Sequence, residues 1–151
     1  MKKKLLSVLF AIMLIFAVPC TSFAAYGNTV SLGAQGNRSD LIYIKRPKSH
    51  SASTSDKTYT ISAVGASGTK VKIYKYVPSE GTCKIIKAET TIGASGLYST
   101  VVDLTSDSNT FVVCAESGSD SQLVKIQISK VKKSTIDKLK NVTVNVLNFI
   151  K

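Results

Sequence analysis

The chain has 151 residues, with 20 lysine or arginine residues against 9 aspartate or glutamate residues and a formal net charge of +11. That length suffices for one domain with a substantial hydrophobic core, and the charge predicts attraction to polyanions. Lysine greatly outnumbers arginine. This balance disfavours sequence-specific binding of nucleic acid, because arginine is the usual residue for bidentate contacts to it.

The first 24 residues have the three parts of a secretory signal peptide. Three lysines at residues 2–4 precede an almost continuous apolar run over residues 5–18. Ser22 and Ala24 then place small residues at positions −3 and −1 of a cleavage site before Ala25. As a helix, the apolar run would span about 21 Å, less than the roughly 30 Å hydrocarbon core of a bilayer. We therefore expect cleavage between Ala24 and Ala25 instead of a membrane anchor.

Cleavage would leave 127 of the 151 residues, with 17 basic residues against 9 acidic ones and a net charge of +8. No second apolar run of spanning length follows, so we expect a secreted, extracellular protein that is loosely associated with the cell wall and has no transmembrane segment after processing. A lipoprotein acylated on Cys20 is the alternative, but Pro19 directly before that cysteine fits the required sequence poorly. Cys83 and Cys114 remain in the mature chain. A disulfide between them is permitted in that compartment, and their number alone leaves it open.

Residues 25–39 are rich in glycine, serine and asparagine and are expected to form a flexible leader. From residue 40 onward, short runs of β-branched and aromatic residues alternate with turn residues. Seven strands are predicted, at residues 41–44, 58–64, 70–77, 83–88, 97–104, 110–115 and 122–128. This spacing predicts an all-β sandwich of antiparallel strands at residues 40–130. Its core is expected to contain Ile61, Val71, Ile73, Val102, Phe111 and Val113.

The segments between these strands have the composition of turns. The tetrapeptide Gly-Ala-Ser-Gly occurs at residues 65–68 and again at 93–96, where glycine permits a positive φ. Residues 78–81 have the composition of a hairpin loop. Residues 47–56 are mostly serine and threonine and are expected to form a connection.

The basic tail at residues 131–151 is amphipathic. Residues 134–137 resemble a helix-capping sequence, and apolar residues then recur at helical spacings. They are Ile136, Leu139, Val142, Val146 and Phe149. We expect a short C-terminal helix, although Val142, Val144 and Val146 also alternate as they would in a strand, and this alternative stays open.

Several turn-and-strand segments resemble those of small secreted immunoglobulin-like domains of Gram-positive bacteria. They are Lys45–Pro47, Tyr59–Ser62, Gly68–Tyr74, Ile92–Tyr98 and Asn109–Val113. The resemblance implies an extracellular immunoglobulin-like β-sandwich of about seven strands, used for adhesion, spacing or ligand display, and it brings no catalytic motif. The chain has no tryptophan, and Cys83 follows the central hairpin instead of lying on the second strand. The disulfide of animal immunoglobulin domains is therefore not implied.

Catalysis has little support, and we expect no enzymatic activity, no cofactor and no metal site. His50 is the only histidine and has no neighbouring carboxylate in the sequence, so a histidine-based catalytic group would have to form around it alone. With Cys83 and Cys114 it falls short of a structural zinc set. Two Ser-x-x-Lys matches, at residues 67–70 and 129–132, lack the partner motifs of penicillin-interacting enzymes.

Two groups of residues are candidates for ligand binding. Lys72, Tyr74 and Tyr76 share one face of a predicted strand by the period-two rule. If Val71 and Ile73 point to the core, this stripe faces solvent and is suited to sugar rings or anionic polymers. Alternatively, the tyrosines simply pack against neighbouring strands.

The second group lies in the tail and consists of Lys132, Lys133, Lys138 and Lys140. Beside an amphipathic pattern these lysines could dock on an anionic surface, or they form a solvated helix face. The function we expect is non-enzymatic binding to an anionic wall polymer, such as a teichoic acid, or to a glycan. The alternative is a structural or protein-interaction module that partners another exported protein through the apolar face of the tail.

Overall fold

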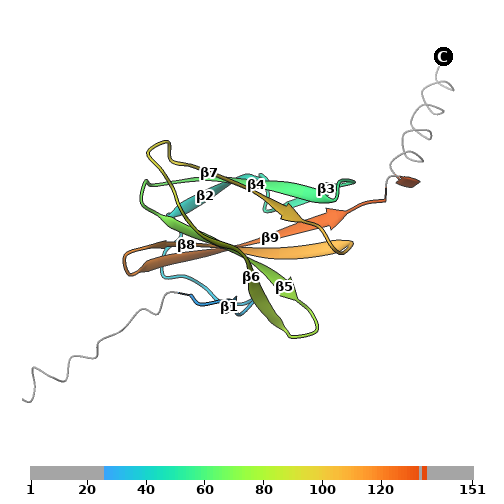
Figure 1. The fold of residues 1–151 in the computed structure, drawn as a ribbon, viewed down its shortest axis with the longest axis horizontal. Helices are drawn as coiled ribbons and strands as arrows, with labels where there is room; N and C mark the ends of the chain where they lie inside the picture. The colour runs from blue at the N-terminus through green and yellow to red at the C-terminus, as the bar shows by residue number, and fades with distance from the viewer. Residues whose placement is uncertain (1–25, 133, 136–151) are drawn as a thin grey trace, which may run out of the picture.

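The computed structural model describes residues 26–132 and 134–135, and nearly all of these residues belong to a β-sandwich (Figure 1). The expected signal peptide, its cleavage site and residues 133 and 136–151 of the tail lie outside the described residues. Among the residues that are described, no helix has the length and apolar character needed to cross a bilayer.

Two sheets pack face to face. The larger sheet has the strand order β1-β6-β5-β8-β9-β3, and the smaller has the order β2-β4-β7. Neighbouring strands are antiparallel except for β3 and β9, which are parallel. The strands are β1 (Thr29–Val30), β2 (Ile42–Arg46), β3 (Ser51–Thr54), β4 (Thr58–Gly65), β5 (Lys70–Val77), β6 (Thr82–Thr91), β7 (Leu97–Asp103), β8 (Ser108–Ser117) and β9 (Asp120–Lys130).

The seven predicted strands are confirmed as β2 and β4 to β9. The structure adds β1 and β3, which the sequence did not indicate. β3 lies within residues 47–56, which were expected to form a connection, and its four side chains are those of serine, alanine and threonine. Such a strand has no apolar period-two pattern, because its small polar residues give neither face a distinct character.

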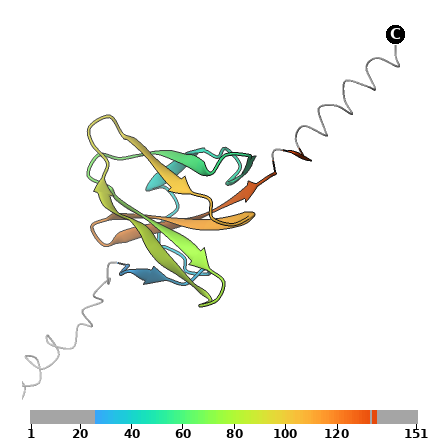
Figure 2. The same cartoon turned by 45° about the vertical axis from the view of Figure 1, so that its right-hand side comes forward.

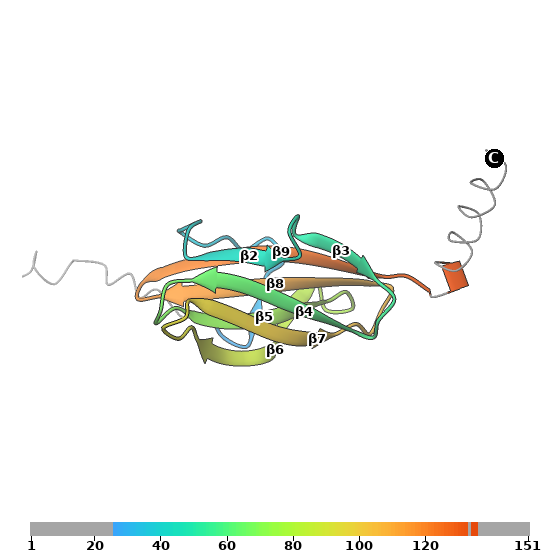
Figure 3. The same ribbon diagram turned by 90° about the horizontal axis from the view of Figure 1, so that it is seen from above.

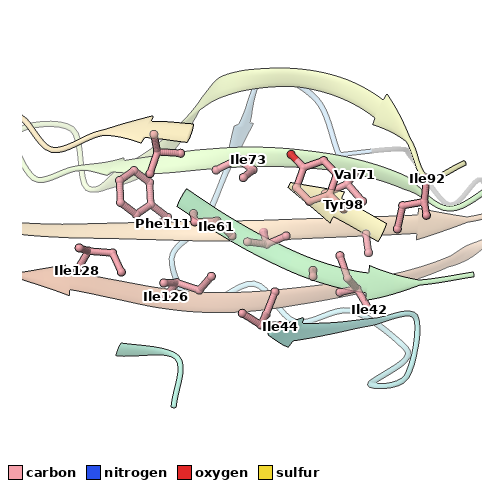
Figure 4. Packing of buried hydrophobic residues seen from close by; sticks show 14 of the residues in the cluster. Ile42, Ile44, Ile61, Val71, Ile73, Ile92, Tyr98, Phe111, Ile126 and Ile128 are labelled. Carbon is pink, nitrogen blue, oxygen red and sulfur yellow. The ribbon is translucent and has the colours of Figure 1, made fainter. Parts of the chain in front are cut away.

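The core lies between the two sheets (Figure 4). All six residues that were predicted to form it are confirmed, with at most 1% of each residue exposed. β2 and β9 extend this core with Ile42, Ile44, Ile126 and Ile128. Alternation along each strand produces this arrangement, because every second side chain of a strand points to the same face of the sheet.

The two Gly-Ala-Ser-Gly turns lie side by side at one end of the sandwich. The last glycine of each turn has a positive φ, 89° at Gly68 and 68° at Gly96. The Gly65 amide donates a hydrogen bond of 3.0 Å to the Gly96 carbonyl, which joins the two turns. The repeated tetrapeptide therefore marks two equivalent turns, as its composition indicated.

Residues 26–39, here called the N-terminal strap, lie against the larger sheet on the side away from the smaller sheet (Figure 2). β1 pairs with β6, and Val30 is buried in a second apolar cluster. A Cβ atom at Gly36 would collide with the Ser121 carbonyl oxygen, so the strap backbone touches the β8–β9 hairpin directly. This differs from the expected flexible leader. The strap is held by hydrogen bonds together with a few apolar side chains, Tyr26, Val30, Leu32 and Ala34, and composition does not reveal these contacts.

The two ends of the sandwich differ in what they contain. β3 and β9 run in parallel and finish side by side, where the Val131 amide donates a hydrogen bond of 2.8 Å to the Thr54 carbonyl (Figure 3). We call this the C-terminal end of the sandwich. The opposite end carries the two Gly-Ala-Ser-Gly turns and the β8–β9 hairpin.

Candidate functional site

The predicted stripe of Lys72, Tyr74 and Tyr76 lies on β5, on the face away from the main core, but it does not face solvent. Tyr74 is fully buried, and its hydroxyl donates to the carbonyl oxygens of Tyr26 and Gly27 at 3.2 and 2.8 Å. Tyr76 is half-buried in the same cluster. The prediction of an exposed stripe is therefore wrong, because the N-terminal strap covers it.

Lys72 is also held inside this interface, with 11% of its side chain exposed. Its ammonium lies 3.0 Å from Glu116, 3.5 Å from Glu89 and 3.0 Å from the Tyr26 carbonyl oxygen. Burial alone would lower the pKa of Lys72, but the hydrogen bonds and charges of Glu116 and Glu89 raise it above its ordinary value. Lys72 thus stays charged and anchors the strap, with no free ammonium for a ligand.

Burial also governs the two other titrating groups beside Lys72. It raises the pKa of Tyr74 well above its ordinary range, with the nearby charges of Cys114 and Glu116 acting in the same direction. It raises the pKa of the Cys114 thiol to about 12, to which Glu116 also contributes. Both groups are therefore neutral at physiological pH and suit a structural role.

The structure contains no disulfide between Cys83 and Cys114. Both are free and buried. Cys83 on β6 is opposite Tyr76, and Cys114 on β8 is opposite Lys72, so β5 lies between them. Two strand spacings come to about 10 Å, beyond the Cα separation that a disulfide allows. The placement of both cysteines beside β5 explains why the tentative bridge is absent.

His50 lies in the β2–β3 connection and is exposed. Its φ is 57°, and its carbonyl oxygen accepts a hydrogen bond of 2.9 Å from the Gln127 amide. Its backbone thus helps to place β3 beside β9. Within residues 26–132 and 134–135, no three histidine, cysteine, aspartate or glutamate side chains are placed to hold a metal ion.

The basic side chains are distributed unequally over the two ends. At the end with the glycine turns, Arg38 pairs with Asp40 and Asp120. At the same end, Lys70 pairs with Glu89, and Lys72 with Glu89 and Glu116. Among the described residues, this end therefore has three basic and four acidic side chains, all in ion pairs.

The C-terminal end is different. Six basic side chains located there form no ion pair with any described residue. They are Arg46, Lys48, Lys57, Lys75, Lys130 and Lys132, which we call the basic end. Three unpaired carboxylates, Asp56, Asp103 and Asp107, accompany them, and Lys84 at this end is neutralised by Glu80 at 2.6 Å. Lys132 was predicted as a binding residue, whereas Lys133, Lys138 and Lys140 lie outside the described residues.

Backbone contacts bring the members of the basic end together from distant parts of the chain. The Leu104 amide donates to the Lys57 carbonyl at 2.8 Å, and the Lys130 ammonium donates to the Leu104 carbonyl at 3.2 Å. Arg46 lies over the Tyr59 ring, 5.2 Å from its centroid. Sequence reasoning found the tail lysines but missed this cluster, because its members are adjacent only after the strands have paired.

The outer face of the smaller sheet carries a row of exposed apolar side chains. Tyr43, Val64 and Leu97 are direct neighbours across β2, β4 and β7. Tyr43 is 63% exposed and Leu97 is 65% exposed, and Val101 follows four residues later on the same face of β7 at 48%. The Lys45 ammonium lies 4.8 Å from the centroid of the Tyr43 ring. Apolar exposure of this kind can mark an interaction surface.

A cleft of about 180 Å³ opens between β7 and the β5–β6 hairpin. Lys75, Ile86, Lys87, Val102, Asp103 and Thr105 line it. The Lys75 ammonium donates to the Thr105 hydroxyl at 2.5 Å and lies 5.8 Å from the centroid of the Phe111 ring. Burial and the nearby charge of Lys130 lower the pKa of Lys75, while Asp103 opposes this shift. The cleft therefore combines two ammonium groups and one carboxylate, a net positive charge, with a partly apolar wall.

Comparison with known proteins assigns no family. No protein-family model matches the chain, and no curated protein matches it. The chain is similar to a solved structure described as an engineered protein, with 10% identity over 62% of this chain and a TM-score of 0.44. The match spans only 20% of that chain. A likeness of this strength carries no argument about function.

Proposed function

We propose that the mature chain is a secreted, non-enzymatic binding module that acts at the cell surface or wall and binds an anionic wall polymer or glycan. Its sandwich is of immunoglobulin-like topology under this proposal. The topology is supported by the passage of the chain from β2 in the smaller sheet to β3 in the larger sheet, where β3 runs parallel to the last strand.

The observation that carries the proposal is the unequal distribution of charge. The end with the glycine turns neutralises all its basic side chains in ion pairs, whereas the basic end leaves six without an ion-pair partner among the described residues. A field concentrated at one end attracts a polyanion and orients the domain as it approaches. The predicted tail lysines would add to this field.

The chemistry of these side chains fits a polymer better than a small ligand. Five of the six are lysines, which act as solvated point charges and do not impose bidentate geometry. Attraction of this kind is long-range and weakly specific. It suits repeated phosphate or carboxylate groups, each of which can meet a different lysine.

Two triple variants of the mature protein test the assignment to the basic end. The first is Lys48→Gln, Lys57→Gln and Lys132→Gln. The matched control is Lys70→Gln, Lys87→Gln and Lys125→Gln, which removes the same formal charge from side chains outside the basic end. Binding to isolated cell walls at low salt should weaken at least about fivefold in the first variant, or roughly 1 kcal/mol, and much less in the control. Equal losses in both would mean that only net charge matters, and the basic end would not be the binding surface.

The alternative, a module that partners another exported protein, rests on a different observation. This is the open edge of β7, an outer strand of the smaller sheet.

A further inference from the structure

The strands at the edges of the two sheets differ in how they are protected from pairing with another chain. An edge strand exposes unpaired amides and carbonyls, and proteins commonly block such edges with charges, bulges, proline or short length. β2 has these protections. The Ile42 amide is bonded to the Gln122 side chain at 2.8 Å, the register shifts between Ile44 and Arg46, and Lys45 and Arg46 add charge.

The edges of the larger sheet are protected as well. β1 and β3 have only two and four residues. β6 is covered at one end by β1, and it also shows two register shifts relative to β5 and carries Lys84 and Lys87. Both the bulges and the lysines oppose the addition of a further strand.

β7 has none of these protections except one charge at its end. Its seven residues pair with β4 without any register shift, and they include no lysine, arginine or proline. Asp103, its last residue, is its only charge. Among the described strands, β7 is therefore the one long edge that is regular and unprotected.

The hydrogen-bond pattern shows which groups of β7 point outward. The bonds from the Leu104 amide to Lys57 and from the Gly65 amide to Gly96 lie at the two ends of the β4–β7 pairing. Hydrogen-bonded and non-hydrogen-bonded pairs alternate in an antiparallel ladder. By that alternation, the amides and carbonyls of Ser99 and Val101 point away from β4, toward the open edge.

The surroundings of the edge define the chemistry of an added strand. On the outer face, Leu97 and Val101 are exposed and favour apolar neighbours. On the inner side lies the cleft with Lys75 and Lys87. Since side chains alternate along a strand, an added strand would place every second residue on the outer face and the others over the cleft.

We propose that the β7 edge binds an extended segment of another exported protein as an additional strand. In that segment, apolar residues that cover Leu97 and Val101 alternate with acidic residues that face Lys75 and Lys87. Main-chain hydrogen bonds supply affinity in this mode of recognition, and the alternate side chains supply specificity. A second copy of the chain fits less well, because a two-fold β7 pair would bring two sets of cleft lysines toward each other.

The probe is a nine-residue capped peptide of alternating valine and glutamate, and the control peptide alternates valine and lysine. Binding to the full mature protein is followed by backbone amide shifts and hydrogen exchange. The glutamate peptide should shift the resonances of the Ser99 and Val101 amides and slow their hydrogen exchange. The lysine peptide should bind at least about tenfold more weakly. Equal binding of the two peptides, or shifts elsewhere on the domain, would overturn the proposal.

Three variants separate the backbone and side-chain contributions. Val101→Pro removes an outward amide without breaking the β4 ladder, and it should abolish binding, whereas Val101→Thr keeps the amide and should retain most of it. If Val101→Pro does not fold, Val101→Lys is the replacement variant, because a lysine on an edge strand opposes the addition of a further strand. It should abolish binding in the same way. The double variant Lys75→Gln, Lys87→Gln should weaken binding of the glutamate peptide at least about fivefold. Lys125→Gln on β9 should leave this binding unchanged.

Other occupants of the edge would give a different result. If the Ser99 and Val101 amides are already protected from exchange without peptide, the edge is filled by a second copy or by a segment of the chain itself. Sedimentation would distinguish these two cases, and either would overturn the proposal.

Discussion

Phe111 is the largest apolar side chain in the core between the sheets and is completely buried. It lies on β8, next to Lys75 on β5 and Ile126 on β9. Its ring also lies near the cleft under β7, because the Lys75 ammonium that lines this cleft lies over the ring.

Phe111→Ala should lower the free energy of unfolding by about 3–5 kcal/mol, since it removes a buried ring and leaves a cavity. Denaturant unfolding of the mature protein measures this change. If the free energy of unfolding falls by less than about 1 kcal/mol, Phe111 is not buried between β8 and the smaller sheet as described.

The buried thiol of Cys114 makes stability depend on alkaline pH. Its pKa in the folded protein is about 12, against an ordinary value of 9.0. Above about pH 9 the unfolded chain loses this proton while the folded chain keeps it, so stability falls as pH rises toward 12. The slope from this one group is at most about 1.4 kcal/mol per pH unit.

Cys114→Ser should flatten this alkaline loss, measured by denaturant unfolding between about pH 8 and pH 11. Cys83, Tyr74 and Tyr98, whose pKa values burial also raises, should account for the slope that remains. An identical pH dependence in the variant would show that Cys114 is not buried as a thiol.

At the scale of elements, the N-terminal strap determines what the larger sheet exposes. It buries the tyrosines of β5 and ends in a group of polar contacts around the β8–β9 hairpin. There the Asn37 side chain accepts a hydrogen bond of 2.7 Å from the Ser121 amide, and Arg38 pairs with Asp120 at 3.0 Å. The strap is therefore part of the folded domain.

Gly36→Ala tests this contact. A methyl group at Gly36 would collide with the Ser121 backbone, whereas one at Gly33 would meet nothing within 4 Å. We expect Gly36→Ala to cost about 1–3 kcal/mol, as overpacking typically does, and Gly33→Ala to change stability little. Thermal unfolding of the two variants makes the comparison. Equal stabilities would show that the strap does not lie against the hairpin.

The strap also shows where the sequence is and is not informative. Period-two alternation correctly placed Val71 and Ile73 in the core, and therefore Lys72 and Tyr74 on the opposite face. It did not reveal that this face is covered, because part of the contact uses the backbone carbonyls of Tyr26 and Gly27. Any residue can supply such groups, and the strap adds only a few apolar side chains, such as Val30, among its polar residues.

The candidate sites likewise depend on how the strands pair, which the sequence does not show. The free cysteines follow from the order of β6, β5 and β8, which the spacing of strands along the chain does not fix. The basic end depends on the pairing of β3 with β9 and on contacts such as Lys57 with Leu104. The composition predicted a basic domain, and only the folded topology locates its charge.

At the scale of the whole molecule, the two ends of the sandwich have different electrostatic character. One end has its charges in ion pairs around the strap, and the other has lysines beside the last strand that form no ion pair with the described residues. The β7 edge lies along the side of the sandwich, and its cleft shares Lys75 with the basic end. The two proposed surfaces therefore meet at this lysine.

The most direct test of this account is a salt titration of the mature protein on isolated cell walls. The Debye length shortens from about 10 Å at 0.1 M salt to about 3 Å at 1 M. Binding through the basic end should therefore be present at 0.1 M and fall steeply by 1 M. Absence of binding at low salt, or binding that is unchanged at 1 M, would contradict electrostatic attachment to an anionic wall polymer.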